Sequence, residues 1–279
     1  MQETLICLNR RRFLLASGAL FARLASGQEA PEGPWNGPAI VKKLYLGGRP
    51  GWPRPDLDLG EDVKAIEAQL AELERRYPNQ IRLTGGEMVR NAEETAAWLK
   101  KSDDADVVLA FNLVTIIHPM LRVLVESGKP TLLFARPYAG HDWTHAAAYM
   151  QKGARLELIA SSDFADLDPY IPLLRTVHHL RASKVLLVSP PAARPATEGF
   201  TKQFGTRFGF PSYLDLKAAY DATDPEDARR QAEAFMRAAV RVVEPSPQEI
   251  TDSLRLYLAL RRFLHQQQAN AIAIDCLGG

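Results

Sequence analysis

Short apolar runs alternate with amphipathic stretches along most of the chain. Continuous runs such as residues 106–111 (DVVLAF) and 131–135 (TLLFA) predict strands that are buried on both faces. Between such runs, segments such as 61–77 place apolar side chains at helical spacing. Strands that alternate with helices are typical of parallel sheets. We therefore predict an α/β protein with parallel sheets covered by helices on both faces.

The same pattern gives approximate bounds for the elements. Predicted strands span residues 40–46, 81–83, 106–111, 131–135, 156–160, 184–188, 213–216 and 271–275. Predicted helices span residues 61–77, 119–127, 143–152, 169–180, 197–208, 225–243 and 247–267, and another begins at Asn91.

These elements divide into two Rossmann-like lobes, with a predicted boundary near residues 160–175. We assign residues 39–165 to the first lobe and 166–279 to the second. The final strand runs into 275–279 (DCLGG), which is typical of the start of a loop that leads to a helix. A buried parallel strand normally needs a covering helix, so we expect the second lobe to be truncated. The alternative is a sheet that ends on an edge strand.

Residues 1–27 are typical of an export signal rather than of a fold. An arginine cluster at 10–12 precedes Phe13 and a short apolar stretch at 14–24, which is about half the roughly 20 residues that span a bilayer. This resembles a twin-arginine signal, with Asn9 in place of Ser or Thr. We expect export to the periplasm or beyond, without a membrane anchor, and a linker at 28–38. The alternative is a basic N-terminal helix on a cytosolic protein.

Composition and charge narrow the function only a little. The chain has 46% apolar and 24% charged residues and a formal net charge of +1, so nothing indicates a nucleic-acid groove. Removing residues 1–27 removes four arginines and one glutamate, which changes that charge to −2. Two cysteines, Cys7 and Cys276, exclude a disulfide framework.

Ligands of open α/β sheets bind at the carboxyl ends of the strands. The chemically richest segment there is 136–145 (RPYAGHDWTH), which follows a predicted strand. Its planar polar and aromatic side chains suit the hydroxyls and carbons of a sugar. The predicted substrate-binding residues are Arg136, His141, Asp142 and Trp143, together with Asn112 at the end of another strand. Alternatively, Asp142 caps a helix and Trp143 packs against it.

Other motifs point to ordinary structural roles. His141 and His145 are four residues apart but lack the glutamate of a zinc-protease motif, so we predict no metal site there. His118 fits the start of a helix, with a role next to Asn112 as the alternative. His178–His179 fit a surface or core position within a helix, and His265 fits the end of one. No dinucleotide fingerprint, phosphate loop or nucleophile elbow is present, and we predict no bound cofactor in this chain.

Three segments together resemble the L-fucose/L-arabinose isomerase superfamily: 136–143, with its His-Asp-Trp, 112–115 (NLVT) and 274–279 (IDCLGG). The resemblance covers residues 39–279. It implies a homo-oligomer that interconverts aldoses and ketoses through an enediol with a divalent metal, usually Mn²⁺. In that family the metal ligands would lie after Gly279, so we expect the 279-residue chain to have no isomerase activity. The first lobe would help to close a neighbouring subunit's sugar site through His141, Asp142 and Trp143.

A second hypothesis is an exported two-lobe binding protein for a sugar or another small solute. Two Rossmann-like lobes behind a signal fit that architecture. The segment 275–277 and the twin-arginine-like signal favour the isomerase relationship instead.

Overall fold

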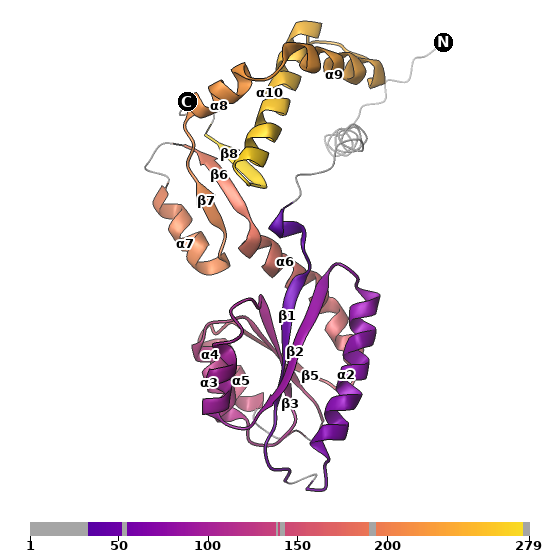
Figure 1. Ribbon diagram of the computed structural model, residues 1–279, viewed down its shortest axis with the longest axis vertical. Coiled ribbons are helices and arrows are strands. Elements are labelled where there is room, and N and C mark those ends of the chain that lie inside the picture. Colours follow the sequence, from indigo (N-terminus) through magenta and orange to yellow (C-terminus); the bar gives the residue numbers. More distant parts are fainter. Residues whose placement is uncertain (1–32, 52–54, 138, 140–142, 190–193, 276–279) are drawn as a thin grey trace, which may run out of the picture. The chain divides into compact units, whose positions relative to one another are not determined.

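The computed structural model describes residues 33–51, 55–137, 139, 143–189 and 194–275. It confirms the α/β class, with two parallel sheets and helices around them (Figure 1). The chain divides into two compact units. The larger unit comprises residues 34–182 and 202–206, and the smaller comprises the described parts of 183–201 and 207–275. In the described part of the chain, no helix has the length and apolar character needed to cross a membrane.

The larger unit contains five parallel strands in the order β2-β1-β3-β4-β5. Its elements in chain order are η1 (Pro34–Asn36), β1 (Ala39–Leu46), α2 (Leu59–Arg76), β2 (Ile81–Val89), α3 (Ala92–Leu99), β3 (Val107–Asn112), α4 (His118–Glu126), β4 (Thr131–Ala135), α5 (Trp143–Gln151), β5 (Leu156–Ala160), η2 (Phe164–Tyr170) and α6 (Ile171–Ala182). The strand order changes direction between β1 and β3, which is where α/β sheets of this type bind ligands.

Helices cover the five-stranded sheet on both faces. In Figure 1, α3, α4 and α5 lie together on one face, and α2 lies on the opposite face, as expected for right-handed crossovers that change direction after β2. The core between the layers contains the fully buried rings of Tyr45, Phe111 and Phe134. The Phe111 ring lies 5.6 Å from each of the other two, centroid to centroid.

Gly85 and Gly86 leave room for polar contacts between β1 and α2. The strand predicted at 81–83 continues to Val89 through Gly85 and Gly86, whose φ angles are +73° and +118°. A Cβ on Gly86 would lie 2.9 Å from Oε1 of Glu67. That carboxylate accepts hydrogen bonds from Lys43 Nζ at 2.5 Å and from Tyr45 Oη at 2.7 Å. Burial, followed by the hydrogen bond to Glu67, raises the pKa of Tyr45.

Helix α6 belongs to the larger unit, although we predicted a boundary before it. It packs against β1 and η1. His178 explains much of this attachment, because its Nδ1 lies 2.7 Å from Oδ2 of Asp106 and its Nε2 lies 2.9 Å from the carbonyl of Pro34. Asp106 also accepts a hydrogen bond from the backbone N–H of Ile40 at 2.9 Å. One carboxylate thus joins α6, β1 and the start of β3.

The smaller unit has a parallel sheet in the order β7-β6-β8. Its elements are β6 (Lys184–Val188), α7 (Arg194–Phe204), β7 (Arg207–Gly209), α8 (Tyr213–Asp221), α9 (Pro225–Ala238), α10 (Pro247–Gln266) and β8 (Ala271–Ile274), except that the last turn of α7, from residue 202, belongs to the larger unit. The strand predicted at 213–216 is wrong, because these residues begin α8. Ser212 and Asp215 form a capping box there, which favours a helix start over a strand. The helix predicted at 197–208 ends earlier, and 207–209 form β7.

We predict that Asp106→Ala destabilises the larger unit by about 3 kcal/mol, because it leaves the His178 ring and the Ile40 N–H without their shared acceptor. Asp104→Ala is the matched control. That carboxylate is 69% exposed and lies 3.7 Å from Lys42 Nζ, so its loss should change stability by less than about 0.5 kcal/mol. Hydrogen-exchange protection of the β1 and β3 amides measures both effects. Equal losses of protection in the two variants would contradict the structural role assigned to Asp106.

Candidate functional site

The candidate site begins with the pairing register of three central strands. Asn112 is the last residue of β3, and it pairs with Leu46 at the end of β1 and with Ala135 at the end of β4. Because these strands are parallel and end at one level, the segments that follow them meet at the same edge of the sheet.

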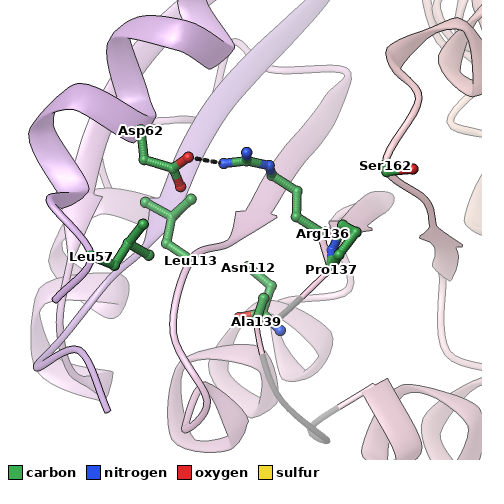
Figure 2. A pocket seen from close by; sticks show the side chains of 8 residues that line it. All are labelled: Leu57, Asp62, Asn112, Leu113, Arg136, Pro137, Ala139 and Ser162. Carbon is green, nitrogen blue, oxygen red and sulfur yellow. Dashed lines mark hydrogen bonds and ion pairs between the residues drawn. The ribbon is translucent and has the colours of Figure 1, made fainter. Parts of the chain in front are cut away.

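A pocket of about 210 Å³ lies at this edge (Figure 2). It combines apolar walls with four polar side chains. The described residues that line it are Leu57, Asp62, Asn112, Leu113, Arg136, Pro137, Ala139 and Ser162. They come from the loop before α2 and its first turn, from the last residue of β3, and from the segments that follow β3, β4 and β5.

An ion pair joins two sides of the pocket. Figure 2 shows Asp62 of α2 facing the guanidinium of Arg136, which directly follows β4, and Oδ1 of Asp62 accepts from Nη1 of Arg136. Asp58 fixes the first turn of α2, because its carboxylate caps the backbone N–H groups of Gly60 and Glu61 at 2.8 and 3.2 Å. The side chains of Asp62 and Arg136 are 13% and 27% exposed, so the pair is only partly screened by water.

The side chain of Asn112 is the most unusual feature of the pocket. The residue is 1% exposed, and neither Nδ2 nor Oδ1 has a hydrogen-bond partner among the residues that the structure describes. An unpaired buried polar group of this kind costs about 1–3 kcal/mol, and native structures contain few of them. The amide therefore lies in the pocket wall, and no described residue uses its capacity to donate and accept hydrogen bonds.

Two of the five residues predicted from sequence meet in this pocket. Asn112 and Arg136 both line it, although they are separated along the chain by β4 and α4. Trp143 is the first residue of α5. His141 and Asp142 lie outside the described residues, so their substrate role and the capping alternative for Asp142 both stay predictions.

Sequence reasoning missed Leu57 and Asp62. We examined the residues directly after each predicted strand, and the long proline-rich loop after β1 separates these two positions from that strand. A usable signal was present, because Asp58 precedes a helix that follows the first strand of the sheet. The start of that helix lies near the site in folds of this class.

A second group of side chains lies at the starts of α4 and α5. His118 is the first residue of α4, as predicted, and its ring lies 4.1 Å from that of His145, centroid to centroid. Its Nε2 is 3.1 Å from the hydroxyl of Tyr149. Among the residues that the structure describes, no three His, Cys, Asp or Glu side chains gather as a metal site would require. The described residues therefore do not fit the manganese centre of carboxylates and histidine that the resemblance implies.

Comparison with known proteins does not place the chain in a family. No protein-family model matches it, and no curated protein matches it either. The proposed function therefore depends on the chemistry of the pocket.

We predict that Asn112→Leu raises the free energy of unfolding of the larger unit by about 1 kcal/mol or more. Leucine has a similar branched shape and brings no unpaired polar atoms into the buried wall. The same substitution at Asn91 should act in the opposite direction. The Asn91 side chain caps α3 by accepting from the Glu94 N–H at 2.8 Å, and its loss should cost about 1 kcal/mol. Urea unfolding of both variants measures the difference, and destabilisation by Asn112→Leu would show that its amide has a structural partner.

Proposed function

We propose that the larger unit binds a small polyhydroxylated molecule in the pocket at the carboxyl edge of its sheet. A monosaccharide is the proposed ligand. The observation that supports this most strongly is the buried amide of Asn112 in the pocket wall, which has no partner among the described residues. Each of its polar atoms has almost no exposed surface, so ligand entry must shift the side chains that cover it. A hydroxyl that both donates and accepts would then satisfy the two groups.

The remaining polar groups suit the same chemistry. The ion pair between Asp62 and Arg136 occupies one carboxylate oxygen and one guanidinium nitrogen. Among the described residues, further guanidinium N–H donors and the second carboxylate oxygen have no other hydrogen-bond partner and can serve ligand hydroxyls. Ser162 adds a hydroxyl from the segment after β5. Apolar side chains such as Leu57 and Leu113 can contact the carbons of a sugar ring.

The size of the pocket supports a small ligand. Its volume of about 210 Å³ is below the roughly 300–1,000 Å³ that is usual for drug-sized molecules. One sugar ring is compatible with that space, whereas a dinucleotide is too large. This agrees with the absence of a dinucleotide fingerprint in the sequence.

The wider role that we propose is that of a sugar-isomerase-like protein, supported by the resemblance of residues 112–115, 136–143 and 274–279 to that superfamily. The described residues supply polar contacts that can bind and orient a sugar. They do not supply the metal ligands that the resemblance implies, so we derive no proton transfer between carbons from them. Homo-oligomeric assembly and export by the twin-arginine pathway belong to the same proposal.

An exported sugar-binding protein is the alternative, and it would use the same pocket without catalysis. Conversion of an aldose to a ketose distinguishes the isomerase hypothesis from the binding-protein hypothesis. Conversion of a bound aldose to its ketose by the purified chain with Mn²⁺ would assign catalysis to this chain, contrary to our expectation.

We predict that the purified protein binds simple aldoses or alditols, measured by calorimetric titration, and that Asn112→Leu weakens this binding by roughly tenfold or more, about 1.4 kcal/mol. The loss follows because leucine can neither donate to nor accept from a hydroxyl. Asn91→Leu is the control: it changes a helix cap outside the pocket and should leave the affinity unchanged. Equal affinity of the wild type and Asn112→Leu would contradict the proposed site.

A further inference from the structure

Asp62 and Arg136 are the charged residues among the described side chains that line the pocket. They carry opposite charges and contact each other directly, so this part of the pocket has no net charge (Figure 2). The remaining described lining residues are an amide, a hydroxyl and apolar groups. Within the described lining, the positive charge of the Arg136 guanidinium is therefore already compensated by Asp62.

The position of Asp62 makes this compensation a property of the pocket itself. Asp62 lies in the first turn of α2, and the Asp58 cap holds that turn in place. It is 13% exposed, compared with 69% for Glu61, the neighbouring carboxylate that pairs with Lys64. An anionic ligand approaching Arg136 would meet the carboxylate of Asp62 with little water between the two charges. A neutral hydroxyl meets no such repulsion and can donate to that carboxylate while it accepts from Arg136.

We propose that Asp62 is the specificity-determining residue of this pocket. By holding the guanidinium of Arg136, it reserves the site for uncharged polyols and excludes sugar acids and other small carboxylates. Without Asp62, the guanidinium is free to bind a carboxylate with two parallel hydrogen bonds, the geometry that suits these two groups. This inference rests on the proposed sugar-binding function.

A simpler alternative is that the ion pair only ties α2 to the segment after β4. That role predicts a different result, because loss of the ion pair would then weaken the binding of neutral and anionic ligands by similar factors. A change in the preference between the two ligands distinguishes a specificity role from a clamp.

The test compares two ligands with the same carbon skeleton, the neutral arabinitol and the anionic arabinonate, by calorimetric titration of the full chain. The wild type should bind arabinitol at least tenfold more tightly than arabinonate. Asp62→Asn should shift the ratio of the two affinities at least tenfold toward arabinonate. Glu61→Gln makes the same change in net charge one residue away, outside the described pocket lining, and should leave the ratio unchanged.

The double variant Asp62→Asn with Arg136→Gln removes both charges and should lose the gain in arabinonate binding. Asp62→Ser, a smaller replacement, makes the same test if asparagine prevents folding. Arabinitol binding by the wild type, without a shift toward arabinonate in either Asp62 variant, overturns this inference and leaves the proposed function standing. Binding of neither ligand by any variant overturns both.

Discussion

Parallel pairing in register at the centre of the larger sheet is the constraint on which the site depends. Asn112 is paired on one side with the last residue of β1 and on the other with the last residue of β4. This fixes where the three following segments leave the sheet, and it brings Arg136 close to the start of α2. A shift of one residue in β3 would turn the Asn112 side chain to the opposite face of the sheet, away from the pocket. The polar groups of the site are therefore positioned by the same hydrogen bonds that build the core.

The chemistry of the pocket works against the stability of the fold that supports it. A buried amide without a partner among the described residues and a half-buried ion pair both lower the stability that apolar side chains would provide at the same positions. The apolar residues of β3 and β4, which lead to the site, belong to the main core of the larger unit, and that core can tolerate such a cost. Proteins commonly retain groups of this kind where function requires them.

Much of the fold could be predicted from the pattern of apolar residues, whereas the site could be predicted only in part. The buried runs of β3 and β4 gave correct strands because parallel strands covered on both faces are continuously apolar. The strand predicted at 213–216 was wrong, because the Ser212 and Asp215 cap outweighed the local strand tendency. Asn112 and Arg136 were found because they directly follow strands. Asp62 was missed because its contact with Arg136 spans 74 residues of sequence and depends on tertiary structure alone.

The Asn112 amide itself gives the most direct test of the proposed sugar site. Nuclear magnetic resonance of the side-chain NH₂ of Asn112, during titration with a monosaccharide that the protein binds, reports whether that group becomes hydrogen-bonded. If a sugar binds at the proposed site, we expect these resonances to shift in proportion to occupancy and the protons to exchange more slowly at saturation. Saturation of the protein without any change at Asn112, while resonances elsewhere move, would contradict the account, because the sugar would then bind at another site.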